Sequence, residues 1–255
     1  MEITVLGCSG SRGKGLRTTA FLVDNALLLD AGTITEALSL EQCAQINHIL
    51  ITHAHIDHIG DLPFLVESVL GLRKEPIYVH AIDEVIEDIS SHIFNDHVWP
   101  DFSEIPSAKE PILSYRRIKP LESITVGSYN VLPIPVNHIV PTVGYLIDDG
   151  KTVLAFAADP YFTELFWQKT QTEQRLGALI VEASFPNRLE EVAEVTKHLT
   201  PTLMAEELKK LKRSDVDVYV THMKPPYRRE LIVELKKLSR RLPIKILEDD
   251  MKIIL

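Results

Sequence analysis

The sequence is poor in cysteine and contains no long apolar run. Its two cysteines, Cys8 and Cys43, form no C-x-x-C pair, so a disulfide framework is not expected. No apolar stretch approaches the roughly 20 residues that a membrane-spanning helix needs. The first residues lack the basic segment and apolar core of a secretory signal. We therefore expect a soluble cytoplasmic protein with no membrane partner.

Positive charge is also in deficit. The chain has 27 Lys and Arg against 36 Asp and Glu, which gives a net charge of −9. An acidic surface repels phosphate backbones, so broad nucleic-acid binding is not expected, although a small phosphate-bearing substrate can still bind at a local cationic site. The 255 residues, 45% of them hydrophobic, are sufficient to bury a large core in one large domain or two small ones.

Short apolar runs that alternate with helical patterns occur in two successive halves of the chain. Strands are predicted at 3–7, 18–32 (two strands), 48–52, 77–81, 123–138, 143–159, 178–183, 217–222 and 244–249. Helices are predicted at 58–71, 83–98, 201–214 and 228–241, the third with Thr200 as N-cap and Pro201 at its first position. This order predicts an α/β fold in which two packed sheets carry helices outside. We expect one domain over 1–255, built of two similar halves (about 1–115 and 120–255), with the proline-rich region 98–120 as a long loop between them.

The segment "ITHAHIDHIG", residues 51–60, holds four residues of types that bind metals, three histidines and one aspartate, directly after a predicted buried strand. Neutral imidazole and carboxylate are good ligands for divalent transition metals. In an extended chain His53 and His55 point the same way, whereas the adjacent Asp57 and His58 point apart. One segment can therefore serve two metals. A histidine-rich surface loop is the alternative, but four such residues at this spacing favour a metal site.

Two complete metal sites need further ligands from elsewhere in the chain. The candidates are His138, Asp159 and His222, because each follows a predicted strand. Taken alone, each has an ordinary structural explanation; Asp159, for example, precedes Pro160 and fits a simple turn. Their joint placement at strand ends favours the ligand role.

The segment "THAHIDHIG" resembles the signature of the metallo-β-lactamase fold, and His138, Asp159 and His222 match, in order, the later ligand motifs of its two-metal members. The resemblance extends from "LGCSGSRG" and "LLLDAGT" to "VTHMKPPY". It implies an αββα sandwich of two mixed sheets, with helices on the outer faces and the site at one edge. It also implies two divalent metal ions, of which zinc is expected first and manganese or iron also fit. The implied ligand sets are His53, His55 and His138 for one ion and Asp57, His58 and His222 for the other, with Asp159 bridging both.

Two features of the later motifs indicate the chemistry. β-Lactamases of this fold commonly carry a cysteine between the third histidine ligand and the last, but both cysteines here precede the cluster and Asp159 stands at the corresponding place. An oxygen ligand that bridges two ions favours phosphoester hydrolysis, in which two metals stabilise the entering and leaving oxygens. The segments "VEASFPN", "KHLTP" and "THMKP", and the Trp-Pro of "FNDHVWPDF", are similar to motifs of the class II cyclic-nucleotide phosphodiesterases.

This resemblance implies hydrolysis of 3′,5′-cyclic nucleotides, which are small-molecule substrates, to 5′-nucleotides. The tRNA 3′-end processing nucleases share the Glu-Ala-(Ser/Thr)-Phe motif and the following histidine, so they are the first alternative. They would need a protruding arm or a basic surface, which the acidic composition does not favour. The non-enzymatic alternative is a nucleotide- or metal-binding module that lost catalysis. The sequence does not decide whether the substrate base is adenine or guanine, nor whether the protein is a monomer or a homodimer.

The resemblance also implies roles in catalysis for three residues. His198 would contact phosphate and protonate the leaving oxygen, Glu182 would orient His198, and Asp57 counts as catalytic as well as a ligand. The alternative for His198 is an exposed loop histidine.

Asp30 in "LLLDAG" is either a hydrogen-bond partner of a ligand histidine or an ordinary turn aspartate. Four histidines fit no ligand position: His48, His80, His92 and His97.

Overall fold

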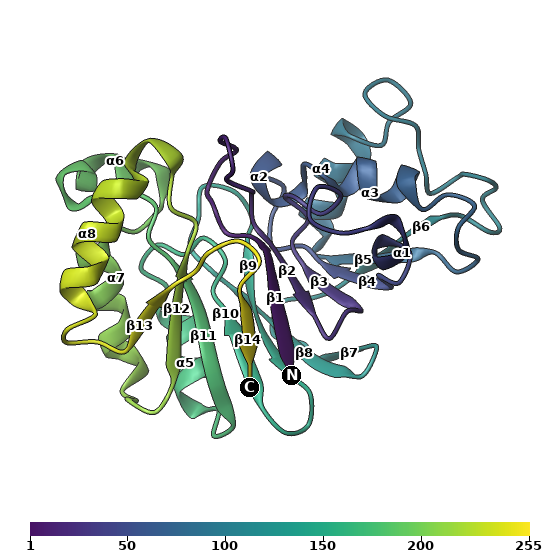
Figure 1. Ribbon diagram of the computed structural model, residues 1–255. Helices are drawn as coiled ribbons and strands as arrows, with labels where there is room; N and C mark the ends of the chain where they lie inside the picture. The colour runs from purple at the N-terminus through teal and green to yellow at the C-terminus, as the bar shows by residue number, and fades with distance from the viewer.

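Two seven-stranded mixed sheets form the centre of the fold, shown in Figure 1 as a computed structural model that describes residues 1–255. In the first sheet the order is β14-β1-β2-β3-β4-β5-β6. Neighbours from β14 to β3 are antiparallel, and those from β3 to β6 are parallel. Its strands are β1 (Glu2–Gly7), β2 (Ala20–Val23), β3 (Leu27–Leu29), β4 (His48–Leu50), β5 (Ile77–Ala81), β6 (Leu113–Arg117) and β14 (Lys252–Ile254).

The second sheet has the order β13-β12-β11-β10-β9-β8-β7. The strands that come first in the sequence, β7 to β10, form an antiparallel meander, and β10 to β13 are parallel. Its strands are β7 (Ile124–Val126), β8 (Tyr129–Pro135), β9 (Val143–Asp148), β10 (Val153–Phe156), β11 (Leu176–Glu182), β12 (Asp217–Thr221) and β13 (Ile244–Ile246).

Helices lie outside both sheets (Figure 1), so the predicted αββα sandwich is confirmed. Beside the first sheet lie α1 (Leu40–Cys43), α2 (Ile56–Ile59), α3 (Leu62–Ser68) and α4 (Asp83–His92). Beside the second lie α5 (Glu164–Thr172), α6 (Glu190–Thr196), α7 (Pro201–Leu208) and α8 (Arg228–Leu238), with short 3₁₀ turns at η1 (Asn187–Leu189), η2 (Lys209–Leu211) and η3 (Pro225–Tyr227). None of the helices combines the length and the apolar character that a membrane span requires.

Side chains on the two faces of each strand enter two different apolar cores. In β11, Ala178 and Ile180 point toward the core shared with the first sheet, whereas Leu179 and Val181 point toward the core under the helices. Both faces of this strand are buried, which explains its continuous apolar run. Burial of each leucine, isoleucine or valine side chain of this strand stabilises the fold by about 1.5–3 kcal/mol.

Two edge strands were not predicted. The region 98–120 was expected to be a loop throughout, but it contains β6, which pairs in parallel with β5. The last strand, β14, pairs with β1 and joins the end of the chain to the first sheet. Both strands are short and mainly polar or exposed at their outer positions, so their pairing is decided by the neighbouring strand rather than by a local apolar pattern.

The predicted start of the third helix is confirmed, because the Thr200 hydroxyl accepts from the Leu203 amide and Pro201 occupies the first position. Asp57 and His58 do not lie in an extended loop, because the helix predicted from residue 58 begins two residues earlier. They lie on α2, one helical turn that begins at Ile56. This turn changes the direction of the chain directly after His55, the N-cap residue of α2.

Candidate metal centre

Segments that follow strands bring the seven predicted ligands together at one edge of the sandwich. His53 and His55 follow β4, His138 follows β8, and His222 follows β12 directly. Four of the seven, His53, His58, Asp159 and His222, are almost fully buried, and the other three are half-buried. Among these seven residues, three overlapping groups have all their ligand atoms within 4.8 Å of one another: His53, His55 and His138; His53, His58 and Asp159; and Asp57, His58 and His222. Two further groups include His198, one with His138 and Asp159 and one with Glu182 and His222.

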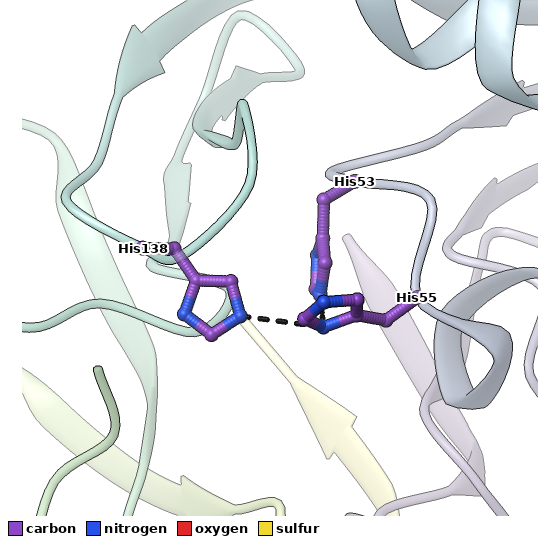
Figure 2. A group of neighbouring side chains, drawn as sticks. All are labelled: His53, His55 and His138. Atoms are coloured by element: carbon purple, nitrogen blue, oxygen red, sulfur yellow. Dashed lines mark hydrogen bonds between the residues drawn. The ribbon is translucent and has the colours of Figure 1, made fainter. Parts of the chain in front are cut away.

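Three imidazoles converge at one end of the centre, as Figure 2 shows. His55 Nδ1 lies 3.0 Å from His53 Nε2 and 3.3 Å from His138 Nε2. His53 and His55 come from the first sheet, and His138 reaches them from the second (Figure 2). This is the histidine set that the sequence predicts for one ion.

The second group lies on the other side of Asp159. His222 Nε2 lies 3.1 Å from His58 Nε2 and 3.3 Å from Asp57 Oδ2. Asp159 Oδ2 lies 3.3 Å from both of these ring nitrogens and 3.8 Å from His53 Nε2. One carboxylate oxygen therefore faces ligand atoms of both groups, which is the placement expected of a bridging residue.

Hydrogen bonds outside the centre orient the rings. His58 Nδ1 lies 2.7 Å from Asp30 Oδ2, and His138 Nδ1 lies 3.1 Å from the Lys197 carbonyl oxygen. Both acceptors lack hydrogens, so in each neutral ring Nδ1 donates and Nε2 presents a lone pair to the centre. His53 Nδ1 contacts the Thr52 hydroxyl at 2.9 Å, and that hydroxyl donates to Asp30.

The arrangement fits divalent cations. Several lone-pair nitrogens face one another at hydrogen-bond distance, where they repel unless a positive charge lies between them. Asp159 Oδ2 is buried and accepts no well-oriented hydrogen bond, a costly state for a carboxylate oxygen. Imidazole and carboxylate donors are the set that zinc, manganese and iron accept.

The protonation states support ligand roles. Burial lowers the pKa of His138 to about 4, so the ring is neutral at neutral pH, as a ligand must be. Burial alone would raise the pKa of Asp159, but His222 and His58 outweigh it and hold the pKa well below its usual range. Burial also opposes protonation of His58, yet the Asp159 and Asp30 carboxylates raise its pKa well above the ordinary value. Without a cation, a proton on His58 is the positive charge available to Asp159.

His198 and Glu182 form a hydrogen-bonded pair beside the centre. His198 Nδ1 lies 3.0 Å from Glu182 Oε1, and the same oxygen accepts from the Leu199 amide at 3.0 Å. His198 is 6% exposed, so the alternative of an exposed loop histidine is wrong. Burial lowers the pKa of His198 and, together with Asp159, raises that of Glu182. These directions place the shared proton on Glu182 and leave the imidazole neutral.

Three residues that sequence reasoning did not single out support the site. Thr52 links His53 to Asp30, and Ser184 Oγ contacts Glu182 and lies 2.9 Å from His222 Nδ1. Lys224 Nζ lies 3.4 Å from Asp57 Oδ2 and donates to the Gly10 carbonyl. A hydroxyl within two residues of a candidate site residue, as in "THAH" and "EASF", was the available signal. The lysine is brought in by the fold, since it also contacts the loop after β1.

Asp30 is confirmed as a partner of a histidine, and the four excluded histidines lie elsewhere. His48 and His80 lie on β4 and β5, with ring nitrogens 3.2 Å apart. His92 and His97 are exposed. None of the four belongs to a group of candidate ligand atoms.

Asp30→Asn is expected to weaken metal binding about 10–100-fold, the usual cost of losing an outer-shell partner. Asp30 is fully buried, and its carboxylate orients His58 directly and His53 through Thr52. Affinity is measured by competition with a chelator, and a melting curve without metal verifies folding. Asp215→Asn, at an exposed ion pair with Arg213, is the control. Wild-type affinity in a folded Asp30→Asn protein would contradict the role of Asp30.

Comparison with known proteins agrees with this geometry. A family model described as a β-lactamase superfamily domain matches residues 25–223, a range that includes all seven candidate ligands. The chain is 26% identical to the probable 3′,5′-cyclic-nucleotide phosphodiesterase of Yersinia pestis over an alignment of 281 positions, gaps included. The alignment covers 89% of this chain and 79% of that protein. It is 27% identical to ribonuclease Z of Metallosphaera sedula over 161 residues, which cover 60% of this chain and 50% of that protein.

One solved structure with the same architecture is that of unliganded yeast PDE1. It superposes with a TM-score of 0.84 over 100% of this chain and 99% of that chain, at 20% identity. Similarity at this level of identity shows the shared fold. The activity has to be argued from the residues at the site.

Proposed function

This chain belongs to the β-lactamase superfamily, and from that premise we propose that it is a phosphodiesterase that uses two divalent metal ions to hydrolyse 3′,5′-cyclic nucleotides to 5′-nucleotides. The observation that carries the proposal is the position of Asp159, whose buried Oδ2 faces ring nitrogens of both histidine groups. An oxygen shared between two ligand sets suits a pair of ions, and a pair of ions suits phosphoester hydrolysis.

In this proposal the residues divide into two ligand sets. One ion would be held by His53, His55 and His138 and the other by Asp57, His58 and His222, and Asp159 would contribute to both sets. Zinc is favoured because histidine-rich oxygen and nitrogen sites suit it, and manganese or iron would be accepted as well. When bound, the two ions supply positive charge for the phosphodiester and activate water for attack.

His198 supplies the proton that the leaving 3′ oxygen needs. Because Nδ1 of His198 is hydrogen-bonded to Glu182, Nε2 is the ring nitrogen left to donate a proton to the substrate. As the Nε2 proton passes to the oxygen, Nδ1 takes the proton of Glu182, and the pair ends as neutral His198 and ionised Glu182. This relay agrees with the raised pKa of Glu182 and the lowered pKa of His198.

Relatives named ribonuclease Z support a second candidate, a tRNA 3′-end processing endonuclease. A nuclease that holds tRNA gains most of its affinity from cationic contacts with phosphates, and the net charge of −9 opposes that. A small cyclic nucleotide carries a single phosphate charge and needs no such surface. The acidic balance therefore favours the small-molecule substrate.

A hydrolysis screen tests the proposal. Metal-loaded protein is expected to convert cyclic AMP or cyclic GMP to the 5′-nucleotide, and a chelator should abolish the reaction until zinc or manganese is restored. A linear diester and a pre-tRNA complete the panel, with products resolved by chromatography. Cleavage of pre-tRNA but of neither cyclic nucleotide would favour the nuclease. If the loaded protein cleaves none of the four, the chain is a binding module instead.

A further inference from the structure

A hollow of about 240 Å³ opens beside His55. Its walls include Ile56 and Ile59 of α2, Ile93 just after α4, and Val140 from the loop after β8. Figure 1 shows α2 and α4 next to each other at this edge. The volume is below the roughly 300–1,000 Å³ of sites that enclose a whole small-molecule ligand. It suits one flat part of a ligand whose remainder lies at the metal centre.

The apolar walls carry two polar side chains. Asp88 and His92 both line the hollow, and at a spacing of four residues they occupy the same face of α4. Neither side chain forms a hydrogen bond or an ion pair with the rest of the chain. The Arg117 side chain does form an ion pair with α4, but its partner is Asp83 at the start of the helix. A carboxylate without a partner at the rim of an apolar hollow next to the candidate metal centre is available to a ligand.

We propose that this hollow binds the base of the substrate and that Asp88 selects guanine over adenine. The inference rests on the proposed function and names the substrate of that same site. His55 belongs both to the first ligand set and to the lining of the hollow, so a molecule with its phosphate at the ions can extend its base along His55. Aliphatic side chains on the walls cover the faces of the base, and the polar pair on α4 contacts its edge.

The chemistry of the two base edges gives the selectivity. Guanine presents two adjacent donors, N1–H and the N2 amino group, next to the O6 acceptor. An ionised carboxylate only accepts, so Asp88 can take both donors in a two-point contact, while a neighbouring imidazole N–H of His92 can donate to O6. Adenine places one donor, the N6 amino group, beside the N1 lone pair. Asp88 would then gain one hydrogen bond and face a second acceptor.

A neighbouring hollow of about 410 Å³ on the His138 side is the competing location. Its polar side chains are all uncharged, since burial keeps the His138 ring neutral, and the Thr142 hydroxyl already donates to the Val140 carbonyl. Asn137 is the exposed group there that could contact a base. The unpartnered charge of Asp88 favours the smaller hollow.

Asp88→Asn is the decisive variant, because an amide of the same shape offers one acceptor and one donor, the pattern that matches adenine. The wild type is expected to show a kcat/KM for cyclic GMP roughly 10- to 100-fold above that for cyclic AMP, the discrimination of a two-point contact. In Asp88→Asn the ratio should fall to about one or below. Each rate is divided by that of the same protein on bis(p-nitrophenyl) phosphate, which carries no base.

Glu87→Gln is the matched control. Glu87 is exposed on the same helix and does not line the hollow, so this variant removes the same charge without touching the base site. Its ratio should equal that of the wild type. An equal change in Glu87→Gln and Asp88→Asn would overturn the proposal, because the effect would then be one of general charge. A ratio that responds to Asn137→Ala but not to Asp88→Asn would also overturn it, in favour of the larger hollow.

Equilibrium binding separates this inference from the proposed function. If the wild type cleaves the base-free diester but neither cyclic nucleotide, the proposed reaction fails, and calorimetry with 5′-GMP and 5′-AMP then decides the base site. Tighter binding of 5′-GMP by the wild type, reversed in Asp88→Asn, supports the site. Equal affinity for the two nucleotides in the wild type overturns it.

Discussion

Replacing Asp159 with alanine is expected to lower the metal content of a fully loaded sample from about two ions per chain to one or fewer. Asp159 Oδ2 faces both histidine groups, at 3.8 Å from His53 Nε2 of one group and 3.3 Å from the Nε2 atoms of His58 and His222 of the other. Hydrolysis should fall by more than the 10–100-fold typical of outer-shell losses. Mass spectrometry or anomalous scattering counts the ions.

A second readout follows stability rather than activity. A ligand that binds the folded chain alone stabilises it by about 2.7 kcal/mol at a hundredfold excess over its Kd. Zinc should therefore raise the melting temperature of the wild type, and raise it much less in Asp159→Ala. Asp83→Ala, at an exposed ion pair with Arg117, is the control for loss of an aspartate. Full two-ion occupancy in Asp159→Ala would show that Asp159 does not bridge the ions.

His198→Ala should reduce kcat by roughly 10²–10⁴-fold, the usual contribution of a positioned proton donor, while the metal content stays near normal. The reason is that His198 bonds to Glu182 and lies beside Asp159, 3.9 Å from its Oδ2, without being needed in either ligand set. His55→Ala should instead lose metal and activity together. His97→Ala, at an exposed histidine, is the control.

The leaving group distinguishes the two roles that His198 can have. A diester with an acidic phenol as leaving group needs little protonation, so the loss caused by His198→Ala should be much smaller on it than on a cyclic nucleotide. Equal losses on both substrates would mean that His198 binds phosphate and donates no proton. Loss of metal in this variant would make it a ligand and invalidate both ligand sets.

Local sequence was sufficient for part of the site and most of the fold. His53, His55, Asp57 and His58 lie within six residues, so any fold that ends a strand before them places them near one another. The cap of α7 depends on Thr200 and Pro201, which act on their own first turn. Apolar runs such as Ala178–Val181 mark strands buried on both faces, wherever their partners lie.

Contacts between distant segments required the tertiary structure. The pairing of Asp30 with His58 joins residues 28 apart, and that of His58 with His222 joins residues 164 apart. Neither pair leaves a periodic signal, since each depends on which strands end at the same edge of the sandwich. The edge strands β6 and β14 were missed for a related reason: their hydrogen bonds come from β5 and β1, and their own residues show little apolar alternation.

The sequence by itself determined the donor types, their order along the chain and the αββα architecture, because these follow from local spacing and from the apolar pattern. Only the tertiary structure decided that Asp159 faces both histidine groups and that Glu182 holds Nδ1 of His198. It also decided that Asp88 of α4 lines a hollow beside His55. The physical reason is that a ligand site needs atoms within a few ångströms, and the packing of two sheets and their helices sets those distances.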